Sequence, residues 1–334
     1  MTSSSFLSGH FEGGGNYDGK GAINASVSEA IRAGIIWINA AGNHHGRVYS
    51  GPVTIDSDSY ATFGKTPSPY VSFINRVDEN TFTITLTWND YRETEDAGTT
   101  KDLDLILEDS EGREIAKSTL KQITGDRSAN EGETKNPRER IVVPDLAKGT
   151  YRLRVKANSK NFGKDDRIRI LLSPSRSEPV PHAELNKFIN PVQFAEATNQ
   201  EELFPPADHP RVITVGEQTE YSAMGPTADR RLKPDIVLPS LAAKWSNGET
   251  YGGTSYAAAY FAGVTAVLKA QNPTLTTDDL MRWIRTLRNS MQSAQRVTYS
   301  QNGKTIVQNV VPSPKPEPAV WRTPSPAEWE AMKK

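Results

Sequence analysis

The sequence contains no cysteine, and none of its apolar runs approaches the length of a membrane-spanning helix. Without cysteine the fold has no disulfide bond and no thiolate metal site, and cysteine usage cannot indicate the cellular compartment of the protein. A net charge of −1 excludes general electrostatic capture of nucleic acid or of an anionic membrane. The segment Met1–Leu7 lacks the basic start and apolar run of a signal peptide, so localisation stays open.

The rest of the composition is that of an ordinary globular chain, with 36% hydrophobic and 24% charged residues. The 334 residues allow two domains, or one domain with a large insertion.

The stretch Gly252–Val264 places a hydroxyl at the entry to a helix of small and apolar residues. A helix that is apolar on every side is normally buried, and burial would fix Ser255 at the positive end of the helix dipole. The preceding glycines allow other backbone to approach closely. This placement suits a nucleophile, but most Ser and Thr residues at such positions are simple N-caps, so taken alone Thr254 or Ser255 is expected to be only that.

A second stretch, Gly34–Asn43, is predicted to follow a helix and to contain a buried strand. Ile23, Val27 and Ile31 recur on one helical face, and Gly34 is a C′ residue. The apolar run 35–38 predicts a strand covered on both faces, with Asn43 just beyond its carboxyl end, where open α/β sheets bind ligands. Asn43 with His44 could also supply only a turn.

A third stretch joins a short strand over 212–215, a turn-rich loop over 222–227 and a strand over 235–238 that is limited by Pro234 and Pro239.

Together, and in this order, the three stretches resemble the second half of a subtilisin-family serine protease catalytic domain. The resemblance implies Ser255 as nucleophile and Asn43 as oxyanion donor. It further implies a polypeptide substrate bordered by five residues: Ala41, Gly42, His44, Gly253 and Thr254. His44 and His45 could instead be an exposed pair in a loop. The family usually has methionine and proline where this chain has Tyr256 and Ala259.

Serine-based hydrolysis also needs a base and a carboxylate that orients it. In the family both lie upstream of the strand at 35–40, and neither motif is present in this chain. The histidines are His10, His44, His45, His182 and His209, and none has a matching context. We expect this chain to be a C-terminal fragment of a longer protease. One alternative is a split enzyme in which a separate N-terminal segment supplies Asp and His, and another is a decayed, non-catalytic protein. Members of the family are often secreted.

Residues 70–176 have a different sequence pattern from the rest of the chain. Apolar and polar residues alternate there in several segments, such as 82–88, 151–156 and 168–172. Period-two alternation predicts antiparallel strands, here an inserted β-sandwich that resembles the jelly-roll domains of bacterial subtilases. If this sandwich carried the function, the chain would be a non-catalytic binding protein. Four aspartates leave calcium open as a ligand, but we expect them to form an ordinary solvated polar face: Asp90, Asp102, Asp104 and Asp109.

The expected fold class is therefore α/β: a partial subtilisin-like parallel sheet flanked by helices, with an inserted antiparallel sandwich. The expected divisions are a first core segment over 1–69, the sandwich over 70–176, a second core segment over 177–311 and a proline-rich tail over 312–334. Thr276 and Asp279 predict the cap of an amphipathic helix in the second core segment.

Overall fold

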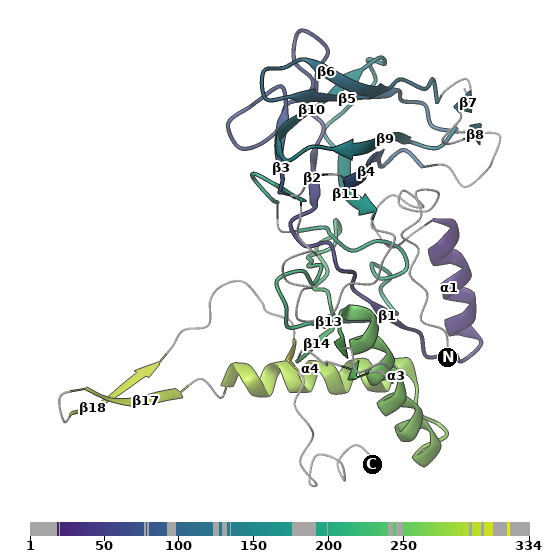
Figure 1. Ribbon diagram of the computed structural model, residues 1–334. Helices are drawn as coiled ribbons and strands as arrows, with labels where there is room; N and C mark the ends of the chain where they lie inside the picture. The colour runs from purple at the N-terminus through teal and green to yellow at the C-terminus, as the bar shows by residue number, and fades with distance from the viewer. Residues whose placement is uncertain are drawn as a thin grey trace.

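The computed structural model describes residues 19, 21–76, 78, 80–91, 98–122, 127–128, 132–133, 135–175, 192–198, 200–239, 243–244, 250–293, 296–301, 304–309 and 319–320. Figure 1 shows two regions: antiparallel strands lie at one end of the molecule, and a parallel sheet with helices lies at the other. The mixed sheets and the helices fit the predicted α/β class.

Helix α1 (Ala22–Arg32) buries Val27 and Ile31 against Val212, as its periodicity predicts. It ends in a Schellman motif, because Gly34 has φ +88° and its N–H donates to the Ile31 carbonyl. The N–H of Ile35 donates to the carbonyl of Ala30 in the same motif. Ile35 thus belongs to the helix cap and is 52% exposed, so the predicted strand begins later than its apolar run.

The parallel sheet has the order β1 (Ile38–Ala40), β13 (Ile213–Glu217), β14 (Ile236–Leu238) and β19 (Ala319–Val320). β1 pairs with β13, β13 with β14 and β14 with β19, all in parallel. The last pair brings two residues of the proline-rich tail into the sheet. The other notable feature of that tail, its tryptophans Trp321 and Trp329, lies outside the described residues.

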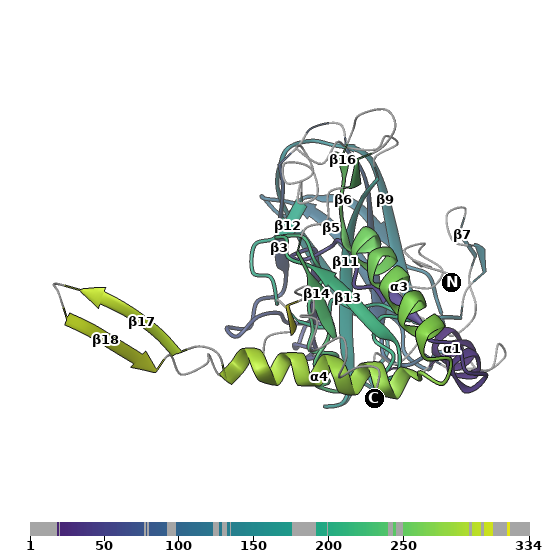
Figure 2. The same ribbon diagram turned by 90° about the horizontal axis from the view of Figure 1, so that it is seen from below.

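Helix α3 (Thr254–Gln271) covers this sheet, and α4 (Thr277–Ser293) lies beside it (Figure 2). Ala257, Ala258 and Phe261 of α3 pack into the same core as Ile213 and Ile236. The opposite side of α3 faces outward, with Tyr260 47% and Val267 55% exposed. The prediction that this apolar helix is buried is therefore correct for one side only.

Two antiparallel sheets form the other region. One has the order β12 (Val192–Phe194), β3 (Val71–Asn75), β10 (Gly149–Ala157), β5 (Leu103–Asp109), β6 (Glu114–Ser118). The other has the order β2 (Val48–Pro52), β11 (Arg167–Ser175), β4 (Asn80–Trp88), β9 (Arg138–Leu146). We call the two together the two-sheet region; β2 and β12 extend it beyond the predicted range 70–176.

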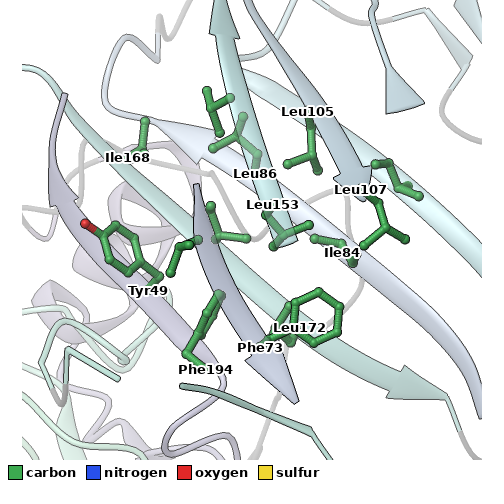
Figure 3. Close-up of a cluster of buried hydrophobic side chains, with 14 of the residues drawn as sticks. Tyr49, Phe73, Ile84, Leu86, Leu105, Leu107, Leu153, Ile168, Leu172 and Phe194 are labelled. Carbon is green, nitrogen blue, oxygen red and sulfur yellow. The ribbon is translucent and has the colours of Figure 1, made fainter. Parts of the chain in front are cut away.

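The core of the two-sheet region is built from the apolar positions of the alternating segments (Figure 3). Ile84 and Leu86 come from one sheet, and Leu105 and Leu153 from the other, and all four are fully buried. Burial of each such side chain stabilises the fold by about 1.5–3 kcal/mol. The period-two pattern thus identified the inward face of each strand.

Three short hairpins complete the described elements. They are β7 (Arg127–Ser128) with β8 (Gly132–Glu133), β15 (Ala243–Lys244) with β16 (Thr250–Tyr251), and β17 (Arg296–Gln301) with β18 (Lys304–Asn309). The last of them extends away from the body of the molecule in both ribbon views (Figures 1 and 2).

Candidate active site

The segment after β1 meets the start of α3 at the carboxyl ends of the parallel strands. The N–H of Ala41 continues the sheet by donating to the Val215 carbonyl at 2.8 Å. Gly42 follows with φ +108°, a conformation that favours glycine, and its N–H donates to Thr254 Oγ1 at 3.1 Å.

Asn43 is tied directly to the first turn of α3. Its Oδ1 accepts hydrogen bonds from the Thr254 N–H and the Thr254 hydroxyl, each at 3.0 Å. Since Oδ1 is occupied in this way, the orientation of the side-chain amide is fixed, and Nδ2 lies beside Gly253. Nδ2 makes no hydrogen bond to any residue that the structure describes.

Gly253 makes this approach possible. It has φ +118°, and a Cβ atom at this position would lie 3.0 Å from Asn43 Nδ2. Gly253 is also the N-cap of α3, and no side chain caps it through a hydrogen bond. The alternative in which Thr254 or Ser255 serves as the N-cap is therefore wrong. Ser255 is the second residue of the helix and is exposed.

His44 points into the protein behind Gly42. Its ring is 4.9 Å from that of Phe204, and Nε2 lies 2.5 Å from the Glu202 carbonyl oxygen. The side chain is only 3% exposed, and burial, together with the nearby Arg47, lowers the pKa of His44 to about 3. His44 thus shapes the loop from inside as a neutral imidazole, and the exposed-pair alternative does not hold for it.

The remaining predicted substrate-binding residues divide between two places. Gly42, Gly253 and Thr254 surround Asn43, and Thr254 among them is fully buried. Ala41 is 2% exposed and packs with Ala223 in a small apolar cluster. The structure therefore brings Asn43, Gly42 and the residues beside Ser255 together, and places Ala41 behind them.

Two charged residues at this site, Arg47 and Glu202, were not predicted from the sequence, because no motif marks them. Arg47 donates to the Asn43 carbonyl, and desolvation lowers the pKa of the Arg47 guanidinium to about 10. The carboxylate of Glu202, which is fully buried, accepts from the His45 ring at 2.9 Å and from the Gly46 N–H at 3.0 Å. The hydrogen bond that His45 donates to Glu202 raises the pKa of His45.

The comparison with family models agrees with this geometry: the model of the subtilase family, Peptidase S8, matches residues 3–305. This chain belongs to the subtilase family. Among solved structures, it is similar to the Clostridium perfringens CspB protease, with a TM-score of 0.51 and 14% sequence identity. The match covers 92% of this subtilase chain and 62% of the CspB chain. At this identity the likeness shows the fold alone.

The histidines described in this subtilase chain are all engaged away from Ser255. His209 is 3% exposed, its Nδ1 accepts from the Arg211 N–H at 3.0 Å, and its Nε2 lies 2.8 Å from Ser28 Oγ. Because Nδ1 is the acceptor, Nε2 holds the proton of the neutral ring. Burial lowers the pKa of His209 to about 4. His10 and His182 lie outside the described residues.

The aspartates that left calcium open are used within the two-sheet region of this subtilase. Asp90 accepts from Thr99 and Thr100, and Asp104 accepts from Asn158 Nδ2 at 2.7 Å. Asp102 and Asp104 are 8% exposed, so their face of the sheet is covered rather than solvated. Within the described ranges, no three Asp, Glu or His side chains gather as metal ligands, and no helix there is long and apolar enough to cross a membrane.

Proposed function

We propose that this chain carries the nucleophile and the oxyanion side of a serine endopeptidase site. Ser255 Oγ attacks the carbonyl carbon of a peptide bond, and Asn43 Nδ2 donates to the oxygen as it becomes negative. The observation that carries the proposal is the pair of hydrogen bonds from Thr254 to Asn43 Oδ1. They fix the Asn43 side-chain amide against the residue that precedes the exposed Ser255.

Gly42 is the accessible part of the border on which the substrate backbone lies in this proposal. Ala41, His44, Gly253 and Thr254 support that border from behind, because all four are buried. Their part in substrate binding is thus indirect.

The base and its orienting carboxylate come from outside the described residues in this proposal. A preceding segment of a longer protein, or a separate chain, supplies them, and these 334 residues alone are inactive. The absence of a histidine hydrogen-bonded to Ser255 among the described residues supports this part. In the same proposal the two-sheet region is an inserted jelly-roll-like sandwich, with domain limits near residues 70 and 176.

Labelling with a fluorophosphonate probe tests the nucleophile in the full-length protein. We expect labelling of the wild-type protein, none in Ser255→Ala and slower labelling in Asn43→Ala, because the probe forms an oxyanion-like adduct. Ser28→Ala is the matched control, since Ser28 is the serine hydroxyl that lies beside His209. Equal labelling of wild type and Ser255→Ala would remove the proposal.

A further inference from the structure

Two adjacent carboxylates, Glu201 and Glu202, lie between the two-sheet region and the segment 41–47, which we call the Asn43 loop. Both side chains are fully buried, at 0% exposure. Glu201 has φ +59°, a left-handed backbone conformation that is uncommon outside glycine. A buried carboxylate is tolerated only where donors surround it, so the partners of each one identify what it holds together.

Glu201 is held by the two-sheet region. It accepts from the Ser50 hydroxyl of β2, and from Arg167 of β11 at 2.5 Å. Two further contacts lie on the same face of that sheet. Arg169 is centred 4.8 Å over the Phe204 ring, and Leu171 packs with Phe204 and Val48.

Glu202 is held by the candidate active site. Its carboxylate accepts from His45, from the Gly46 N–H and from the Met224 N–H at 2.7 Å. Its backbone carbonyl faces His44 Nε2. Glu202 therefore holds the three residues that follow Asn43 in the Asn43 loop, His44, His45 and Gly46.

We propose that Glu201 and Glu202 act as a rigid link through which strands β2 and β11 position the Asn43 loop, a role that rests on the proposed function of Asn43. The two residues are consecutive and donors hold both carboxylates, so a shift of the backbone at one residue is passed to the other. Glu201 and Glu202 are then positioning residues, and the two-sheet region is a working part of the site rather than an attachment.

The first test is amide hydrogen exchange of Gly46 by NMR, because that N–H donates to Glu202. Arg167→Met removes a donor from Glu201 without touching the Asn43 loop. We expect Gly46 exchange to accelerate about tenfold, relative to the Val215 amide of the central sheet, together with a shift of the Asn43 side-chain amide resonance. Ser50→Ala, a milder change, should shift both in the same direction.

Arg154→Met is the matched control. Arg154 pairs with Glu108 in the other sheet and is exposed to a similar extent, 27% against 22% for Arg167. It should leave the Gly46 and Asn43 signals unchanged. If Arg167→Met and Arg154→Met alter Gly46 exchange equally, the effect is general loss of stability and the link is wrong.

Glu202→Gln tests the other half of the link. We expect the pKa of His45 to fall toward its ordinary value, since the carboxylate that raises it is gone; His44 and Arg47 are the other charged or titratable neighbours in the loop. An unchanged His45 titration would overturn the assignment. None of these readouts requires Ser255 to react, so failure of the link and failure of the proposed function are distinguishable.

Discussion

Lys233 is a fully engaged cation at the amino end of the parallel sheet. Its ammonium donates to the Val212 carbonyl and to Asp235 Oδ2, each at 2.5 Å, and Asp235 also accepts from the Thr214 N–H at 2.8 Å. Lys233 is only 6% exposed, and desolvation lowers the pKa of its ammonium group. The pair therefore fixes how β13 and β14 enter the sheet.

Lys233→Met should lower the free energy of unfolding by about 3–5 kcal/mol, because it leaves the Asp235 carboxylate buried without its countercharge. Urea denaturation measures this. Arg282→Met is the control, since Arg282 pairs with Asp279 on an exposed face and should change stability by less than about 1 kcal/mol. Equal losses in the two variants would contradict a special role for the buried pair.

The buried imidazole of His44 predicts an acid-sensitive fold. Its pKa is about 3 in the folded state against an ordinary 6.5, so the unfolded state binds the proton more readily. The stabilisation is complete above pH 6.5 and is lost as the pH falls toward 3. His45 acts in the opposite sense, because its raised pKa gives stability at low pH that is lost as the pH rises.

His44→Gln keeps a donor for the Glu202 carbonyl but removes the titration. Between pH 7 and 4.5 we expect the variant to lose about 2–3 kcal/mol less unfolding free energy than the wild type. Urea denaturation at both pH values measures the difference. Parallel losses in the two proteins would show that His44 does not titrate on unfolding.

At the scale of elements, helix α4 begins with the capping box that the sequence predicted. Thr276 Oγ1 accepts from the Asp279 N–H at 3.2 Å, and Asp279 Oδ2 accepts from the Thr276 N–H at 2.9 Å. Leu280, Ile284 and Leu287 face inward from the same helix. Local sequence thus determined both where this helix starts and which side it buries.

Thr276→Ala should destabilise the protein by about 1 kcal/mol, because the first-turn N–H loses its acceptor. Thr286→Ala is the control on the same helix, where the hydroxyl only bonds back to the Arg282 carbonyl. That change should be nearly neutral in thermal unfolding. A larger loss for Thr286→Ala than for Thr276→Ala would refute the cap assignment.

Other elements were predicted less completely. Alternation identified the inward faces of the long antiparallel strands, since successive side chains of a strand point to opposite faces of its sheet. It did not predict where β1 begins, because the Schellman motif of α1 takes the N–H of Ile35. Nor did proline content predict that Ala319–Val320 would pair with β14.

At the scale of the whole molecule, no histidine among the described residues is hydrogen-bonded to Ser255. We expect the purified 334-residue protein not to cleave casein, because no base reaches Ser255 among the described histidines. A protease activity assay with wild type and Ser255→Ala measures this. Casein cleavage that disappears in Ser255→Ala would show that the chain supplies its own base.

The sequence alone determined the two motifs that end at Asn43 and begin at Ser255, because each depends on neighbours within one segment. Only the tertiary structure decided that His44 is buried, that Arg47 holds the Asn43 carbonyl and that Glu201 and Glu202 face opposite sides. Glu201 and its partner Arg167 are 34 residues apart in the sequence, and Glu202 and its partner Gly46 are 156 residues apart. A buried carboxylate needs donors but does not specify which, so no local pattern records the choice.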